Sequence, residues 1–409
     1  MKRLMPAGLA VLLTACPLAW TSPAWSQIPG NTLKIGVLND MNGPYADPSG
    51  RGSVVAAQMA AEDFAAMAGP SAPKVVILGA DHQNKADVGA SVARRWIDEE
   101  GVTAVVDLPN SAVALAVNQV MREKDRTYLA SSAATSVLTG AQCAPTTVQW
   151  TFDTWALANG SARVLTEEGG KSWFFIAADY ALGQALVKDV GAVVRKTGGT
   201  VLGDVRMPIG TPDMSSYLLQ AQASGAQVIG IGTSGEDATN TVKQAAEFGI
   251  GQDGKQKLVG LLLFLTDIKS MGLKNAQGLI VTEAFYWDMN DATRAWSKRY
   301  AARFGGKMPT MNHAGVYSSI MAYLKAATAI QSVSGAAVVA KMREQPIDDP
   351  LFGPTTIRAD GRAVHAMYIF QVKTPAESKS EYDIYNLIAT IPAAEAFRPL
   401  NEGGCPMIH

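Results

Sequence analysis

Short apolar runs rich in β-branched residues alternate with segments of helical periodicity along most of this chain. The runs are continuously apolar, as in strands covered on both faces, and such strands belong to parallel sheets with helices on each side. In the first 140 residues we expect strands at Leu33–Leu38, Val75–Leu78, Thr103–Val106 and Thr127–Ala130, and helices near Gly52–Met67, Ala86–Glu100 and Ser111–Lys124. This order predicts one doubly wound α/β lobe.

A second series of the same kind begins near residue 173. Its expected strands are Trp173–Ala177, Val201–Met207, Val228–Ile231 and Leu258–Phe264, with helices near Leu182–Lys196, Ser215–Ala223 and Ala238–Phe248. A chain of 409 residues is too long for one compact core. We therefore expect two Rossmann-like lobes.

The later part of the chain breaks this order. One strand, Leu279–Ala284, precedes three helical patterns, and the runs Thr355–Arg358 and Ala366–Val372 are joined by the hairpin-turn signal Asp360-Gly361. Because this material returns to cover both lobes, we expect a multi-strand hinge with crossings at Gln149–Thr154, Thr266–Gly278 and Pro346–Pro354. Lobe 1 is then expected to hold residues 31–150 and about 279–345, and lobe 2 residues 151–278 and about 346–400.

Residues 1–26 have the pattern of an export signal, with Lys2 and Arg3 before a short apolar run and Ala24-Trp25-Ser26 at the expected cleavage point. This leader predicts a periplasmic protein. A competing site at Cys16 resembles a lipobox and would instead leave a lipid-anchored protein.

Without Cys16, the cysteines that remain are Cys143 and Cys405. In an oxidising compartment they predict a disulfide that holds the polar tail, and two separate buried thiols are the alternative. These cysteines and the four scattered histidines lack the spacing of metal ligands, so we expect no metal.

Composition and motifs favour a binding protein over an enzyme. The chain carries 35 basic and 36 acidic residues, which gives no excess for nucleic-acid binding. We find no nucleophile elbow, phosphate loop or metalloprotease motif. Residues 230–235 match G-x-G-x-x-G, but Glu236 and Asp237 follow where a pyrophosphate would sit, so no dinucleotide or other cofactor is expected.

Polar and small residues cluster where expected strands end, which is where doubly wound sheets bind ligands. These clusters are Asn39–Ser49, Asn110-Ser111, Ser131–Thr135 and Thr233-Ser234. Each one alone is equally explained by helix capping. Together they predict a ligand site between the lobes.

At these residues the sequence resembles the periplasmic solute-binding proteins of the branched-chain amino acid class of ABC importers. The resemblance covers nearly the whole chain after the leader and is carried by these segments: Leu33–Leu38 with Asn42-Gly43-Pro44, Ser131–Thr135 with Leu138-Thr139, Ala178-Asp179-Tyr180 with Gly183, and Lys243-Gln244-Ala245 with Gly249. It implies the type I fold, a monomer that closes by hinge motion over its solute, and delivery to an inner-membrane permease. It implies no reaction.

The resemblance also implies site residues. The family positions that hold the solute's carboxylate match Ser111, Ala133 through its backbone, and Thr135, and Ala134 lies in the same segment. On the second lobe we expect Tyr180, Leu182, Ser234 and Asp267 at the site. Tyr45 and Trp155 are expected to add aromatic surface.

Departures from the family pattern bear on the ligand. The aspartate that holds a solute ammonium is replaced by Ala156, and Leu182 and Ser234 stand where aromatic residues are usual. We therefore expect an aromatic carboxylate without an α-ammonium. A branched-chain amino acid or amide, or a sensor module of the same fold, is the alternative.

Overall fold

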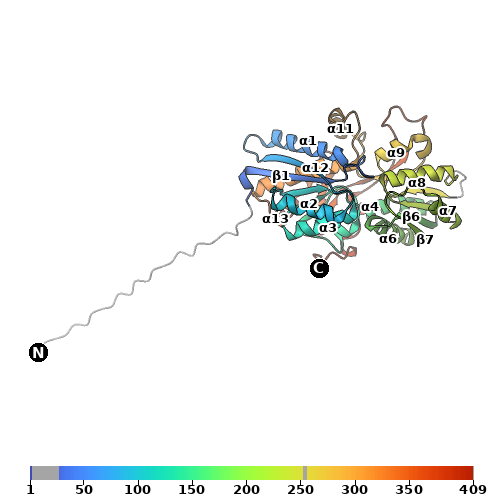
Figure 1. The fold of residues 1–409 in the computed structure, drawn as a ribbon, viewed down its shortest axis with the longest axis horizontal. Coiled ribbons are helices and arrows are strands. Elements are labelled where there is room, and N and C mark those ends of the chain that lie inside the picture. The colour runs from blue at the N-terminus through green and yellow to red at the C-terminus, as the bar shows by residue number, and fades with distance from the viewer. Residues whose placement is uncertain (2–26, 252–255, 409) are drawn as a thin grey trace.

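Two α/β lobes lie side by side in the computed structural model of this protein, which describes Met1 and residues 27–251 and 256–408 (Figure 1). The expected signal peptide, residues 1–26, lies outside the described residues apart from Met1, and so does Cys16. Within the described ranges, no helix combines the length and the apolar character needed to cross a bilayer.

Lobe 1 is built on a parallel sheet in the order β2-β1-β3-β4-β5. Its strands are β1 (Thr32–Asn39), β2 (Lys74–Asp81), β3 (Ala104–Asp107), β4 (Thr127–Ala130) and β5 (Thr147–Gln149). Its helices are α1 (Gly50–Ala68), α2 (Ala86–Asp98), α3 (Ser111–Glu123), α11 (Asp291–Arg303), α12 (Met311–Ile330) and α13 (Gly335–Arg343), with short 3-10 turns at Pro29–Asn31 and Ser136–Thr139. The late helix α12 packs beside α1, as expected for helices that follow without strands of their own (Figure 1).

Lobe 2 repeats this plan with the parallel order β7-β6-β8-β9. Its strands are β6 (Ser172–Ala178), β7 (Thr200–Met207), β8 (Val228–Gly232) and β9 (Lys257–Gly260). Its helices are α4 (Thr154–Leu157), a π-turn (Ala158–Ala162), α5 (Arg163–Glu167), α6 (Ala181–Lys196), α7 (Ser215–Ala223), α8 (Gly235–Glu247), α9 (Leu265–Met271) and α10 (Leu273–Ala276). The predicted pair of doubly wound lobes is confirmed.

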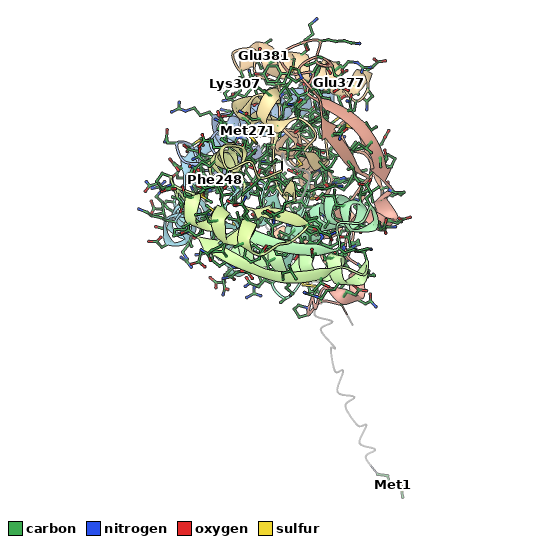
Figure 2. All side chains as sticks on the ribbon, turned by 90° about the vertical axis from the view of Figure 1, so that its right-hand side faces the viewer. Met1, Phe248, Met271, Lys307, Glu377 and Glu381 are labelled. Carbon is green, nitrogen blue, oxygen red and sulfur yellow. A yellow bond between two sulfur atoms is a disulfide. The ribbon has the colours of Figure 1, made fainter. Side chains whose placement is uncertain are left out.

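Strand β10 (Ile280–Glu283) lies in lobe 2, so the expected boundary near residue 279 is wrong. It pairs antiparallel with β14 (Met367–Val372), which pairs in turn with β15 (Tyr385–Ile391), and β10 contacts β9. Figure 2, with lobe 2 toward the viewer, shows the C-terminal strands along one side of that lobe. The second crossing therefore follows β10, at residues 284–290, and not 266–278. A lone apolar strand carries no local signal for the sheet edge that accepts it.

The third crossing also differs from the expectation. The strands β11 (Ile347–Asp349), β12 (Gly353–Ile357) and β13 (Ala363–Val364) form an antiparallel sheet, and β12 contacts α13 of lobe 1. The expected turn Asp360-Gly361 joins β12 to β13, whereas β14 leaves for lobe 2. The chain thus crosses near residue 365, and residues 346–364 belong with lobe 1.

Buried polar groups join the first and third crossings. The Arg362 guanidinium is fully buried, donates to the Phe152 carbonyl at 2.9 Å and lies 3.6 Å from the Asp153 carboxylate. The His365 Nε2 lies 3.0 Å from the Trp150 carbonyl oxygen. Because a buried cation without a partner is costly, these contacts fix the two hinge segments against each other.

The tail returns to lobe 1 after β15, through α14 (Ala393–Ala396) and a 3-10 turn at Leu400–Glu402. Cys405 is bonded to Cys143, with their Cα atoms 5.6 Å apart. The Arg398 guanidinium also donates to the Ser136 carbonyl at 3.1 Å. The tail is thus held beside the segment that follows Thr135.

Candidate functional site

The carboxyl ends of both parallel sheets meet where the lobes touch. The loop after β1 reaches lobe 2 there, and the Glu236 N–H donates to the Pro44 carbonyl at 3.3 Å. Two clefts of about 390 Å³ each border this loop, one toward Ile209 and Gly210 and one toward α8 and α9. Ligands of doubly wound folds bind at such an edge.

The expected carboxylate-binding residues lie at neighbouring strand ends of lobe 1. Ser111 begins α3 after β3, and Ala133, Ala134 and Thr135 follow β4. All four are buried, with at most 1% of each residue exposed. The Ser111 hydroxyl has no hydrogen-bond partner among the described residues. The helix start and the free hydroxyl together suit an anion.

Gln149, which we did not expect at the site, supports this segment from β5. Its amide nitrogen donates to the Ala133 carbonyl at 2.8 Å and to the Thr135 carbonyl at 3.1 Å. Both carbonyls are therefore turned toward Gln149. A buried glutamine at the end of an apolar strand is the sequence signal that could have identified it.

Asp107, at the end of β3, is the second residue that we missed. Its carboxylate accepts hydrogen bonds from Asn39 and Ser132 and, at 3.4 Å, from Ser131. Burial raises its pKa to about 6, and these hydrogen bonds lower it only in part. An acidic residue that ends an otherwise apolar strand was the available signal.

The expected residues of lobe 2 divide into two groups. Ser234 precedes α8 and Tyr180 precedes α6, so both lie at strand ends next to the interlobe boundary. Leu182, at the start of α6, is buried in a hydrophobic cluster that includes residues of both lobes. Thr233, beside Ser234, is fully buried and its hydroxyl has no partner among the described residues.

Tyr45 and Tyr180 join the lobes directly, because their hydroxyl groups form a hydrogen bond across the boundary. Tyr45 is 2% exposed and Tyr180 is half-buried. Burial raises the pKa of both phenols, so both stay protonated at neutral pH. The pair closes this side of the interlobe space with two aromatic rings.

Asp267 lies in the first turn of α9 and lines one of the boundary clefts. Its carboxylate accepts from the Phe264 N–H at 2.9 Å. Burial raises its pKa to about 7 against the backbone hydrogen bonds from Phe264 and Gly235. At neutral pH this carboxyl can therefore either accept or donate a hydrogen bond.

The glycines of the G-x-G-x-x-G segment have packing roles. A Cβ at Gly230 would lie 2.7 Å from the Phe175 ring, and one at Gly232 would lie 3.0 Å from the Ala177 Cβ. Gly235 has φ +63°, and a Cβ there would meet the Pro44 carbonyl oxygen of lobe 1 at 2.2 Å. The segment therefore serves strand packing and close approach of the lobes.

Ala156 is buried in α4, and two aspartates lie close to this helix. Asp189, on α6, accepts from the Thr154 hydroxyl at 2.5 Å and from the Ser136 hydroxyl at 2.6 Å. The nearest candidate in the sequence, Asp153, caps α4 by accepting from the Ala156 N–H at 2.8 Å and also pairs with Arg362. Trp155 beside it is half-buried and packs on the same core as Tyr180.

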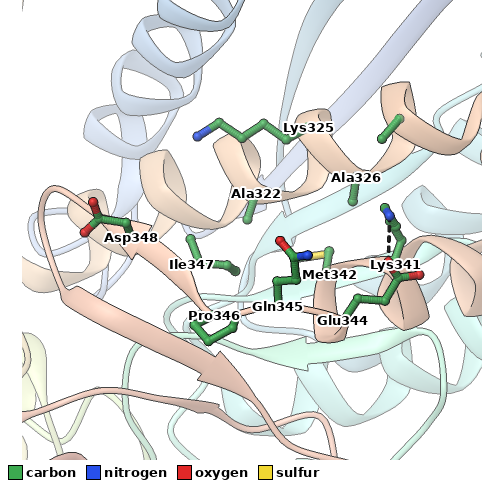
Figure 3. Close-up of a pocket in the computed structure, with 11 residues that line it drawn as sticks. Ala322, Lys325, Ala326, Lys341, Met342, Glu344, Gln345, Pro346, Ile347 and Asp348 are labelled. Atoms are coloured by element: carbon green, nitrogen blue, oxygen red, sulfur yellow. Dashed lines mark hydrogen bonds and ion pairs between the residues drawn. The ribbon is translucent and has the colours of Figure 1, made fainter.

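A further cavity of about 410 Å³ lies away from this boundary, between α12, α13 and β11 (Figure 3). Lys325, Lys341 and Asp348 stand at its edges, and Lys341 pairs with Glu344. None of the expected site residues lines it. In the part of the chain that the structure describes, no group of three or more His, Cys, Asp or Glu residues could hold a metal ion.

Comparisons with known proteins agree with the two-lobed fold. The family described as periplasmic binding protein matches residues 32–380. A periplasmic binding protein from Burkholderia mallei is 43% identical, with a TM-score of 0.89, over 93% of this chain and 100% of its own. A branched-chain amino acid ABC transporter periplasmic ligand-binding protein from Burkholderia xenovorans is 39% identical, with a TM-score of 0.81, over 92% and 100%.

A curated relative, Leu/Ile/Val-binding protein homolog 6 of Brucella melitensis, is 25% identical over 69% of each chain. Proteins of this kind bind small solutes for ABC transporters outside the cytoplasm and catalyse no reaction, as the motifs led us to expect. The chain belongs to the periplasmic binding protein family, within the branched-chain amino acid class of ABC transporters.

Proposed function

We propose that this protein binds a small aromatic carboxylate, of the benzoate or cinnamate type, between its lobes and delivers it to an ABC permease in the inner membrane. The observation that carries the proposal is the fully buried Ser111 hydroxyl without a partner in the described chain. Such a group costs about 1–3 kcal/mol, and a solute carboxylate would accept its hydrogen bond. The Ala133 N–H and the Thr135 hydroxyl would be the neighbouring donors.

The surroundings of Ala156 argue against an α-amino acid. An ammonium buried there would need an anion. Asp153 is already engaged by Ala156 and Arg362, and Asp189 by the hydroxyls of Ser136 and Thr154. An unpaired buried charge costs several kcal/mol. An organic acid without an ammonium avoids this cost.

Aromatic surface at the lobe boundary supports a planar solute. Tyr45 and Tyr180 meet there, and Trp155 is half-buried against the same hydrophobic cluster as Tyr180. By contrast, Trp150, Phe152 and Phe285 are buried at the hinge. Distant neighbours, which share the fold at under 25% identity, include a Rhodopseudomonas palustris protein in complex with benzoate (18% identical, TM-score 0.76).

A branched-chain amino acid is the second candidate. Asp267 offers a buried carboxyl on the lobe 2 side of the boundary, where it could receive an ammonium group. The name of the curated relatives and a leucine-binding protein from Thermotoga maritima, 19% identical, favour the same candidate. For either ligand, we propose that the leader directs a monomer to the periplasm.

Calorimetric titration with benzoate, 4-hydroxycinnamate, leucine and valine tests the proposal. We expect an aromatic acid to bind, and Ser111→Ala to weaken it by about 10- to 100-fold because a charge-assisted hydrogen bond is lost. Ser297→Ala is the matched control, since this serine on α11 is also fully buried without a partner. Tight leucine binding without any response to an aromatic acid would overturn the proposal.

A further inference from the structure

Asp107 stands in an unusual environment at the end of β3. The carboxylate is fully buried, and no cation of the described chain is among the groups that act on it. Its hydrogen-bond donors are the side chains of Asn39, Ser131 and Ser132, all of them neutral. A buried charge held only by neutral donors is costly to keep ionised.

The backbone at this position is also unusual. Asp107 has φ +87° and the following Leu108 has φ +65°, although neither is glycine and both are fully buried. Non-glycine residues in this region persist where surrounding contacts hold them, and they concentrate at functional sites. Here the strained turn leads directly into Ser111.

The carboxylate links three strand ends of lobe 1. Asn39 ends β1, Asp107 ends β3, and Ser131 and Ser132 follow β4. Ser132 immediately precedes Ala133, whose backbone belongs to the proposed solute site. Asp107 is therefore connected to both segments that would contact a solute carboxylate. It lies in the turn that leads to Ser111, and it accepts a hydrogen bond from Ser132, the residue before Ala133.

The titratable groups that face this carboxyl are uncharged near neutral pH. Tyr128 on β4 and Tyr300 on α11 feel its charge, and burial raises the pKa of both phenols. His313 on α12 stacks on Tyr300 with ring centroids 5.2 Å apart, and burial lowers its pKa to about 4. From α1 comes the hydroxyl of Ser53. An arriving anion would therefore act on Asp107 without a neighbouring cation to offset it.

We propose that Asp107 is a positioning residue that holds the two solute-binding segments of lobe 1 together, and that its carboxyl takes up a proton when an anionic solute binds. The proposal rests on the solute site described above. A second negative charge nearby disfavours the ionised carboxylate. By linkage, protonation of Asp107 must favour the bound solute to the same extent.

Titration of benzoate, with leucine in parallel, at several pH values between 5 and 8 tests the proposal. Each measurement is repeated in two buffers of different ionisation enthalpy, which reports the protons taken up. We expect net uptake near pH 6, and a dissociation constant that rises about tenfold from pH 5 to 8 for each unit by which the solute raises the Asp107 pKa. A merely structural residue would not exchange a proton on binding.

Asp107→Asn is the informative variant, because an asparagine side chain has the shape of aspartate but does not ionise. The Ser132 hydroxyl, which now donates to the carboxylate, can accept a hydrogen bond from the new amide. This variant should still bind the solute, and its proton uptake should be lower than that of wild type by the amount that Asp107 contributes. Asp267, with a pKa of about 7, remains in both proteins and cancels in the difference. Asp349→Asn is the control, since Asp349 is a buried aspartate in β11 that also accepts from a serine, Ser318, and whose pKa is also raised by burial.

The outcomes separate the two proposals. Equal proton uptake by wild type and Asp107→Asn, or binding without uptake, would overturn the role of Asp107 while leaving the solute assignment intact. Binding of leucine alone would overturn the aromatic acid and still test Asp107 through the leucine carboxylate. Binding of neither probe would overturn both.

The pH dependence of folding stability, measured without solute, tests the ionisation of Asp107 even if the variant binds poorly. The folded-state pKa of Asp107, about 6, exceeds its ordinary value of 3.8. The folded protein therefore binds more protons than the unfolded chain in this window, and the contribution is lost as pH rises from about 4 to 6. Relative to Asp107→Asn, the folded-to-unfolded ratio of wild type should fall roughly tenfold or more over this range, and parallel pH profiles would contradict the ionisation described here.

Discussion

The two lobes share a doubly wound plan but differ in how their strand ends are held. In lobe 1, Gln149 holds the carbonyls of Ala133 and Thr135, and Asp107 ties three strand ends together. In lobe 2, the Thr233 hydroxyl lacks a partner in the described chain and Ser234 makes no side-chain cap to α8. Cross-linked loops present a preorganised surface, whereas loosely held ones adapt to a partner. We therefore expect the lobe 1 segments to be the more preorganised part of the proposed site.

Loss of the disulfide tests how far the C-terminal tail stabilises lobe 1. Cys405→Ser should lower the free energy of unfolding by about 2–5 kcal/mol, because the bond to Cys143 closes a long loop of the chain. Urea denaturation of protein purified without reductant measures it. Cys143→Ser/Cys405→Ser should lose no more than the single variant, since one bond is lost in each. A single variant as stable as wild type would show that the tail does not stabilise lobe 1.

Gly235→Ala tests the contact of lobe 2 with lobe 1. The new Cβ would strain the left-handed backbone and meet the Pro44 carbonyl across the boundary, so solute affinity should fall at least about tenfold. Gly249→Ala is matched to it, because Gly249 follows the same helix with φ +72° and open space around it. Calorimetry measures affinity, and small-angle scattering measures closure. Equal losses in both variants would assign the effect to backbone strain instead of lobe contact.

Tyr180→Phe should have the smallest effect. It removes the hydroxyl pair with Tyr45 but keeps the aromatic ring, so affinity should fall about three- to tenfold, mainly through faster dissociation. Stopped-flow kinetics separates the two rates. Tyr217→Phe changes a half-buried tyrosine on the outer helix α7 and should leave both rate constants unchanged. A slower association rate alone would show that the pair forms before the lobes close.

Local patterns predicted some elements of this protein well and others poorly. The helix over Ser111–Glu123 and the strand at Thr127–Ala130 follow from uninterrupted periodicity and clear turn residues. The hairpin turn at Asp360-Gly361 was also correct, but its second strand is β13, and β14 pairs in lobe 2 instead. Pairing between residues 85 to 91 positions apart depends on which sheet edge is free, and nothing local to β14 encodes that.

The candidate site shows the same division. The positions of Ser111, Thr135 and Ser234 could be predicted, because polar residues between a strand and a following helical turn have a local pattern. Asp107 and Gln149 could not, because their importance comes from hydrogen bonds to segments 14 to 68 residues away. Leu182 was expected from the motif, and its side chain is buried in the hydrophobic cluster shared by the two lobes.

By itself, the sequence determined that this chain forms two doubly wound lobes, because hydrophobic periodicity is a local property that each strand and helix carries. The tertiary structure alone decided that β10 and β14 join lobe 2, that Arg362 and His365 couple the hinge segments, and that Gly235 meets Pro44. These contacts join residues far apart in the chain. Their energies depend on burial and on the distance between partners, which exist only once the lobes are packed.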